Sequence, residues 1–410
     1  MLKTYSMIPE IRNEYNKQFT EQAYSDFLKE LDNAHPGAIE FRLAETPVFV
    51  DEAFKNKMLE ACESIVDFIV DPAFKELTEK SIPEGERFAN ETSPCQMLVF
   101  DFGICKNKEG EIEPMLIEMQ GFPSMYAFHA WFPEIMRKHL YVPENFTQYF
   151  NGYTRESFIN DFKQLLSDDV PVENVVLLEI KPHEQKTRID FYCTEKYTGI
   201  KPVCISELIQ EGRQLFYMRD GKKTLIKRIY NRVITDELKA RRHEFENLVD
   251  ITQDFDVEWI PHPNWFYRIS KYTLPFLRHE YVPKTFFLNE IKQLPADLEN
   301  YVLKPLFSFA GQGVVIDVTT EEIEKINDPQ NWILQRKVQY ADIIKTPDEN
   351  DPAKAEIRIM YLWNNDWPRP KAVLNLARLS KGKMIGTRYN KNKTWVGGSV
   401  CFFEELRIKN

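Results

Sequence analysis

The chain has 410 residues, of which 43% are hydrophobic and 28% are charged, and its formal net charge is −10. This composition is typical of a globular protein with a large core and two or three subdomains, and it excludes a disordered or fibrous chain. The negative charge argues against nucleic acid as a partner, since binding a phosphate backbone needs a basic surface.

No stretch approaches the run of about 20 apolar residues that a membrane helix needs, and the first residues lack the apolar core of a signal peptide. The six cysteines show no CxxC spacing and are scattered at positions 62, 95, 105, 193, 204 and 401. Such usage is typical of reduced thiols. We therefore expect a cytoplasmic protein with no membrane partner, no disulfides and no structural zinc. The oligomeric state stays open.

The first region, residues 1–90, is predicted to be mainly helical. Residues 21–31 and 52–70 both repeat apolar side chains at i, i+3, i+4 and i+7, which is the pattern of an amphipathic helix. Neither stretch shows residues with an evident chemical role, so the role of this region stays open.

Two carboxylates are predicted to face each other on a β-hairpin formed by residues 95–120. A turn centred between residues 109 and 110 places Asp101 directly opposite Glu118, and Gln120 then points to the same face. Facing carboxylates repel unless a cation bridges them, and oxygen ligands of this kind suit Mg²⁺. The alternative is two exposed carboxylates on a solvated face, which the apolar residues around Glu118 disfavour.

A βαβ unit is predicted at residues 172–206. Residues 172–180 form its first strand, 184–196 its helix and 201–206 its second strand, and Gly199 stands where the helix should stop. Such a unit belongs to a parallel α/β layer.

A further strand is predicted at residues 223–233, followed by a long charged helix from about 235 to 248. Arg228 and Arg232 fall on one face of this strand. They either reach a carboxylate substrate or form structural ion pairs with the helix.

Residues 301–317 combine an apolar strand that carries one lysine, a glycine loop and a second apolar strand. Lys304 stands among apolar neighbours, and a buried cation needs a partner, for which a polyphosphate is suitable. Gly311 and Gly313 would let backbone N–H groups approach phosphate oxygens. The lysine precedes the glycines, unlike in GxxxxGK[ST]. The alternative is a hairpin with a flexible turn and a surface lysine.

These elements and the motifs that follow them form one ordered series along the chain. They are followed by the stretches Trp332–Val338, Glu356–Arg358, Asn375–Arg378 and Lys393–Ser399, the last reading KTWVGGS. Together they resemble the ATP-grasp superfamily, in the permuted order of glutathionylspermidine synthetase-like and circularly permuted ATP-grasp proteins. The match covers roughly residues 95–130 and 172–405, and its strength lies in the order of the motifs.

The resemblance implies an α+β (α/β) fold of the ATP-grasp type with a pre-ATP-grasp α/β domain. It divides the chain into a helical segment at 1–90, a pre-ATP-grasp α/β region with a metal-binding hairpin at 91–260, and a nucleotide-clamping region at 261–410.

The same resemblance implies that Lys271 and Lys304 clamp the phosphates of ATP, and that Gly311 and Gly313 belong to the loop that covers them. We expect this loop, from Phe307 to Gly313, to be mobile without nucleotide and closed with it.

The stretch resembling the family's hinge strand implies the adenine site. There, backbone groups around Gln335, Lys337 and Val338 would read the edge of the base.

In the same way Asp101, Glu118 and Gln120 would hold Mg²⁺, although Gln120 replaces the usual asparagine. The arginine that family ligases place just before the first metal aspartate is absent here. Arg87 and Arg378 are its candidate substitutes, and Arg378 is then a catalytic residue beside Lys304.

The function that follows is an ATP-dependent ligase. It would join a small-molecule or peptide carboxylate to an amine or a thiol through an acyl phosphate, with Lys271, Lys304 and Mg²⁺ neutralising charge. No general base is visible in the sequence. The missing arginine and Gln120 motivate an alternative, a nucleotide-binding ATP-grasp-like protein without turnover. A third possibility is another phosphotransfer reaction on the same fold.

Overall fold

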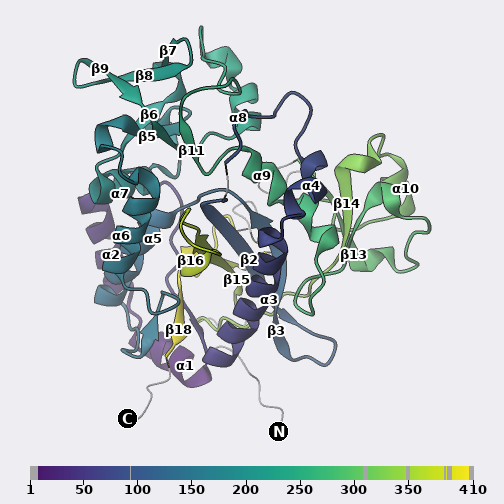
Figure 1. Ribbon diagram of the computed structural model, residues 1–410. Coiled ribbons are helices and arrows are strands. Elements are labelled where there is room, and N and C mark those ends of the chain that lie inside the picture. Colours follow the sequence, from purple (N-terminus) through teal and green to yellow (C-terminus); the bar gives the residue numbers. More distant parts are fainter. Residues whose placement is uncertain are drawn as a thin grey trace.

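The computed structural model describes residues 8–92, 94–307, 313–347, 351–382, 385 and 390–405. Helices pack around five β-sheets in this part of the chain. The expected mixed α and β class is thereby confirmed. Figure 1 shows a central sheet with helices on both sides and a smaller green lobe that projects beside it.

The central sheet has five strands, each antiparallel to its neighbours. In spatial order they are β17 (Gly397–Ser399), β16 (Lys371–Ser380), β15 (Lys354–Leu362), β2 (Met97–Lys106) and β3 (Ile112–Gln120). The hairpin predicted at 95–120 is therefore present, as β2 and β3. Strands from the regions predicted at 91–260 and 261–410 share this one sheet.

Helices cover both faces of the central sheet. Phe100 on β2 belongs to the same apolar cluster as α3 (Glu52–Val70), whereas its neighbour Val99 belongs to the cluster of α5 (Tyr126–His139). Because successive side chains of a strand point to opposite faces, Asp101 points to the α5 face together with Val99.

The two helices predicted in the first region are confirmed, as α2 (Glu21–Ala34) and α3. Side-chain oxygens of Thr20 and Asp51 cap them by accepting backbone hydrogen bonds. Further helices are α1 (Pro9–Gln18), α4 (Phe74–Leu77), α6 (Arg155–Ser167) and α9 (Asn264–Arg268). Across the described ranges, no helix is both long enough and apolar enough to cross a membrane.

A four-stranded parallel sheet contains the predicted βαβ unit. Its strands, in spatial order, are β11 (Glu258–Ile260), β10 (Arg228–Asn231), β5 (Val175–Glu179) and β6 (Lys201–Cys204). Helix α7 (Arg188–Thr198) connects β5 to β6 and ends at Gly199, whose φ of 78° is left-handed. The unit is confirmed, although its helix begins four residues later than predicted because Pro182–Glu184 forms a separate 3₁₀ turn.

The single strand predicted at 223–233 is wrong, because it consists of two strands in different sheets. Strand β9 (Lys222–Ile226) forms a small antiparallel sheet with β8 (Gln214–Arg219) and β7 (Ile209–Glu211). The chain then changes partner at Lys227, whose N–H donates to Asn174, and β10 continues in parallel with β5.

The helix predicted from 235 to 248 is also too long. Helix α8 spans only Thr235–Ala240 and is followed by a 3₁₀ turn at Arg242–Glu244. No residue of α8 is buried. Leu238 of α8 packs only partly buried against a neighbouring apolar cluster, so tertiary packing stabilises this helix weakly.

The green lobe in Figure 1 is a three-stranded antiparallel sheet with its own small core. Its strands are β12 (Thr285–Phe287), β14 (Trp332–Arg336) and β13 (Tyr301–Pro305), and α10 (Thr320–Glu324) lies beside them. The second strand predicted within 301–317 is absent among the described residues there, where Val315 forms only an isolated bridge to Leu303.

The two ends of the described chain meet in a fifth sheet. Strand β1 (Val48–Val50) pairs in parallel with β18 (Cys401–Glu404), which pairs antiparallel with β4 (Phe146–Thr147). All six cysteines are buried and unbridged, as the sequence predicted.

Candidate functional site

The predicted pairing of Asp101 with Glu118 is confirmed, and a β-bulge makes it possible. Phe102 lies opposite Leu116, yet Asp101 lies opposite Glu118, so Ile117 is the extra residue of β3. Without this bulge, Asp101 would not face Glu118.

Gln120 lies on the same face as Glu118 and donates a hydrogen bond from Nε2 to Glu118 Oε1 at 3.1 Å. The spacing of these residues was therefore interpreted correctly. Whether these side chains can bind a metal ion depends on the residues of the neighbouring strand, β15.

Asp101 is fully buried and is held by two arginines. Arg358, directly opposite on β15, donates from Nε to Oδ1 and from Nη2 to Oδ2, both at 2.6 Å. Arg378 on β16 adds a hydrogen bond from Nη2 to Oδ2 at 2.9 Å. Burial alone would raise the pKa of Asp101, but the two guanidinium groups hold it below its usual value.

A second buried carboxylate completes this cluster. Glu356 lies opposite Arg378, accepts a hydrogen bond from its Nη2 and accepts another from the Tyr340 hydroxyl at 3.0 Å. Burial and the nearby Asp101 and Glu118 raise the pKa of Glu356 despite the guanidinium of Arg378. Carboxylates and guanidinium groups therefore alternate in this cluster, from Asp101 on β2 through Arg358 and Glu356 on β15 to Arg378 on β16. Glu118 on β3 lies at the edge of the cluster.

The predicted magnesium site does not fit this geometry. Both oxygens of Asp101 already accept charged hydrogen bonds, and a divalent cation there would meet two guanidinium groups. In the part of the chain that the structure describes, no group of three or more His, Cys, Asp or Glu side chains is arranged to hold a metal ion. In this arrangement Asp101, Glu118 and Gln120 do not fit a magnesium site, and their role as metal ligands stays a prediction.

The cation expected near Asp101 is supplied by a residue that the sequence analysis did not single out. Arg358 makes the bidentate contact, and Arg378, one of the two named substitutes, lies beside it. The other, Arg87, is wrong, because it lies at the surface and pairs with Glu79 and Glu91. Arg358 alternates with Glu356 on a strand of otherwise buried apolar residues, which is the only signal that could have marked it.

Lys271 and Lys304 converge beside Glu118 from different elements. Lys304 on β13 donates from Nζ to Gln335 Oε1 at 2.6 Å and to the carbonyl of the bulged residue Ile117 at 3.3 Å. Lys271 begins a 3₁₀ helix at Lys271–Phe276 and donates to the carbonyl of Pro305 at 3.1 Å.

Both lysines carry perturbed pKa values. Burial, opposed by Glu118 and reinforced by Lys304, lowers the pKa of Lys271 to about 8. Burial also lowers the pKa of Lys304, against the attraction of Glu118 and Glu356. Two partly desolvated ammonium groups this close favour an anion between or beside them.

A pocket opens next to these lysines, with a cavity volume of about 50 Å³. Glu118, Gln120, Lys271 and Asp236 of α8 are the charged and amide side chains that line it, together with others. Its apolar and remaining polar lining comes from Met119, Phe266, Tyr267, Ser270, Leu306 and Phe307. Lys304 is not among the lining residues, but it contacts the carbonyl of Ile117, the neighbour of Glu118. The pocket therefore joins the central sheet, α8, α9 and the green lobe.

The residues predicted to read adenine lie at the end of β14. The side chain of Gln335 is buried and binds Lys304 and Thr285, the latter through Nε2 at 3.1 Å. The backbone N–H of Lys337 donates to the carbonyl of Asn300, so this group is already used within the lobe. Val338 follows in a partly buried loop.

The predicted phosphate loop is described only at its two ends. Gly311 lies outside the described residues, as do the other residues from 308 to 312. Gly313 has a φ of +72°, and an added Cβ would stand 3.0 Å from Pro305 Cγ. Glycine is therefore required at 313 on conformational grounds.

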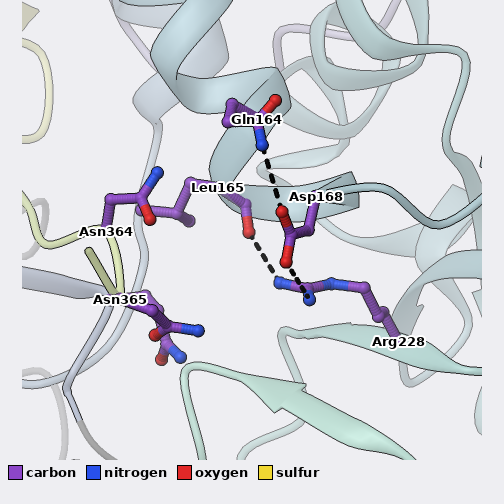
Figure 2. A pocket seen from close by; sticks show the side chains of 7 residues that line it. Gln164, Leu165, Asp168, Arg228, Asn364 and Asn365 are labelled. Carbon is purple, nitrogen blue, oxygen red and sulfur yellow. Dashed lines mark hydrogen bonds and ion pairs between the residues drawn. The ribbon is translucent and has the colours of Figure 1, made fainter.

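Arg228 and Arg232 have structural partners, which settles the alternatives left open for them. Arg228 donates to the carbonyls of Leu165 and Leu166 at 3.0 Å and pairs with Asp168 and Glu258. Figure 2 shows its contacts at a second pocket of only about 10 Å³, enough for roughly one water molecule.

Arg232 donates to the carbonyl of Pro123 and lies against the rings of Phe122 and Phe191, each 5.3 Å from the guanidinium carbon. Among the described residues, neither arginine pairs with the 236–246 segment. Both arginines therefore have structural partners, but these are not the predicted helix.

Comparisons with known proteins give a fold and no family. No protein-family model matches the sequence, and no curated protein matches it. The structure is similar to that of a glutathione synthetase-like effector, GSS30, from Globodera pallida in its apo form, with a TM-score of 0.57 and 9% sequence identity. The likeness covers 97% of this chain and 99% of the other. The two chains therefore share a fold over nearly their whole length.

Proposed function

We propose that this protein is an ATP-dependent ligase with a permuted ATP-grasp arrangement, which joins a carboxylate to an amine or thiol through an acyl phosphate. The observation that carries this proposal is the convergence of Lys271 and Lys304 beside one pocket. Both ammonium groups are desolvated by burial, which lowers both pKa values, and the charge of Lys304 lowers the pKa of Lys271 further. Bound phosphates would stabilise both charges, which water no longer does.

The chemistry asked of this chain is mainly positioning and charge neutralisation. Lys271 and Lys304 would hold the transferring phosphoryl group while a substrate carboxylate oxygen attacks it, releasing ADP. The nucleophile then attacks the acyl phosphate and releases inorganic phosphate.

The pocket must widen to admit a nucleotide. Its volume of about 50 Å³ is well below the roughly 300–1,000 Å³ of ordinary small-molecule sites. Its wall combines residues of the green lobe, Leu306 and Phe307, with residues of the body of the protein, Glu118 and Tyr267. A movement of the lobe away from the central sheet would open it.

A second candidate function is nucleotide binding without turnover. The burial of Asp101 between Arg358 and Arg378 favours it, because a residue expected to hold the metal is withdrawn from the pocket. Measuring ADP and phosphate in the presence of ATP, with and without a carboxylic acid and an amine, separates the two. Release that requires both substrates supports the ligase.

The test of the shared premise is nucleotide binding. ATP at about 100 times its dissociation constant should stabilise the protein by about 2.7 kcal/mol and raise its melting temperature. Lys304→Ala and Lys271→Ala should each remove most of this shift. Lys325→Ala is the matched control, since Lys325 pairs with Glu322 on the surface of α10. A Lys304→Ala protein that keeps the full shift would place the nucleotide elsewhere.

A further inference from the structure

Lys271 combines two features that make an amine nucleophilic. It lines the pocket described above, and it lies close enough to Lys304 for that second charge to disfavour its own. A lysine that is desolvated and next to another cationic group is an activated nucleophile, because a larger share of its amine is unprotonated at neutral pH. The proposed ligase chemistry uses the charge of Lys271 and leaves this second property unused.

The two lysines differ in how they meet the pocket. Lys271 is half-buried and belongs to the lining, and its Nζ donates a hydrogen bond to the carbonyl of Pro305 at 3.1 Å. Lys304 is not a lining residue, and its Nζ donates to Gln335 and to the carbonyl of Ile117. The pocket therefore presents Lys271, rather than Lys304, to a solute that enters it.

The protonation of Lys271 agrees with this position. Burial and the charge of Lys304 lower the pKa of Lys271 to about 8, although Glu118 opposes them. About a quarter of amines with such a pKa are unprotonated at pH 7.5, compared with about one in a thousand for a lysine with the ordinary pKa of about 10.4. Only the unprotonated amine attacks an acyl carbon. At neutral pH, Lys271 therefore carries far more of the reactive form than an ordinary lysine does.

An acyl phosphate is the acylating agent that suits this pocket. Its phosphate group is an anion, which the ammonium of Lys304 attracts while Lys271 is unprotonated. The side chains of Phe266, Leu306 and Phe307 contribute an apolar lining, which limits the water available to hydrolyse the acyl phosphate. A cavity of about 50 Å³ exceeds the 10–15 Å³ or so that one water needs, so a small acyl group has room to reach Lys271.

We propose that Lys271 accepts the acyl group of a small acyl phosphate from solution, and that this modification prevents nucleotide binding. The unprotonated Nζ attacks the acyl carbon, a C–N bond forms, and the bond from the acyl carbon to the phosphate oxygen breaks. Inorganic phosphate leaves, and the proton lost by Nζ passes to it or to water. The product is a neutral amide, so the pocket loses one positive charge. The effect on nucleotide binding rests on the proposed function, whereas the acylation itself does not.

The first experiment treats the wild-type protein with acetyl phosphate and measures the acetylation rate of each lysine by mass spectrometry. At pH 7.5, Lys271 should be acetylated at least tenfold faster than Lys325. The side chain of Lys325 is 67% exposed and does not line the pocket, so it is an internal control within the same sample. No variant has to fold for this comparison. Equal rates at Lys271 and Lys325 would overturn the proposal.

Two further measurements test the cause of this selectivity. The rate at Lys271 should level off above about pH 8, where its amine is already mostly unprotonated. Lys304→Met should slow the acetylation of Lys271 several-fold at pH 7.5, because removing the neighbouring charge raises the pKa of Lys271. Lys325→Met is the matched control and should leave the rate at Lys271 unchanged. A rate that ignores Lys304→Met and keeps rising beyond pH 8 would show that Lys271 is not an activated nucleophile.

The outcome is separable from the fate of the proposed ligase. The acetylated protein, and Lys271→Gln with its neutral amide, should both lose the ATP-dependent rise in melting temperature. If the acetylated protein keeps that rise, the modification does not control nucleotide binding. If ATP gives no shift in the wild type while Lys271 is acetylated selectively, the nucleophile stands and the nucleotide proposal fails. If ATP gives its shift and Lys271 reacts no faster than Lys325, the acylation proposal fails alone.

Discussion

Arg358 lies directly opposite Asp101 across the β2–β15 pair and donates one hydrogen bond to each carboxylate oxygen at 2.6 Å. Both side chains are almost completely buried. This bidentate pair, rather than a metal ion, compensates the charge that the sequence places at residue 101.

Removing the charge of Asp101 should lower the free energy of unfolding by several kcal/mol. Asp101→Asn leaves the buried Arg358 with an incomplete partner, and breaking a buried ion pair from one side typically costs about 3–5 kcal/mol. Urea unfolding measures the change in the free energy of unfolding. Asp254→Asn, at the exposed pair with Arg213, is the control and should cost less than about 1 kcal/mol. Equal losses in the two variants would contradict the buried pair.

Magnesium alone should not bind at the hairpin. In the absence of nucleotide, millimolar Mg²⁺ should change the melting temperature no more than an equal ionic strength of NaCl, because Asp101 offers no unoccupied oxygen. Glu118→Gln should behave in the same way as the wild type in this titration. A saturable shift with Mg²⁺ that Glu118→Gln abolishes would restore the metal site predicted from the sequence.

ATP affinity should fall as the pH rises through about 8. Lys271 has a pKa lowered to about 8, and only its protonated form attracts phosphate, so affinity should fall by up to about tenfold per pH unit above that value. Calorimetric titrations at pH 7, 8 and 9 measure this. Lys271→Met should flatten the profile, and an equally steep profile in that variant would assign the titration to another group.

The same lysine affects stability with the opposite sign. Its pKa in the folded state lies below the value of about 10.4 for an unfolded chain, so between these two values the unfolded state binds more protons. The contribution of Lys271 to the free energy of unfolding therefore rises with pH across that window. Without ATP, Lys271→Met should remove this rise in the urea-derived stability.

Gly121 should not tolerate a side chain. A Cβ at this position would lie 2.5 Å from the carbonyl oxygen of Trp265 on α9, the helix that carries Phe266 and Tyr267 into the pocket. Gly121→Ala should cost about 1–3 kcal/mol, as overpacking does, and should weaken ligand binding. Gly398→Ala is the control, because its Cβ would meet only ordinary contacts at 3.6 Å or more. Similar stabilities for the two variants would contradict the close approach.

Local patterns carried the correct predictions. Asp101 and Glu118 belong to one hairpin, so their spacing along the chain determines which residues face each other, apart from the single bulge at Ile117. Helices α2 and α3 have apolar stripes and capping residues within their own sequences. The permuted arrangement and the roles of Lys271 and Lys304 came from a resemblance and stay predictions.

The errors arose where a distant partner decides the outcome. Arg358 follows Asp101 by 257 residues, and nothing near either residue reveals the contact. The strand predicted at 223–233 reads as continuous, yet its two halves pair with different sheets. The region at 235–248 has helical propensity, but its apolar side chains, such as Leu238 and Phe245, are only partly buried, and only the short helix α8 forms.

The strand order of the central sheet also sets the order in which the protein can be completed during synthesis. The β2–β3 hairpin leaves the ribosome early, but Arg358 and Arg378 follow Asp101 by 257 and 277 residues. Until those residues emerge, burying Asp101 would strand an uncompensated carboxylate, so the nascent hairpin must stay hydrated. Closure of β1 against β18 comes later still, at the pairing of Val48 with Cys401. The central sheet is thus completed only after translation of nearly all of the described chain, and a ribosome stalled before Arg358 would hold a sheet that cannot close.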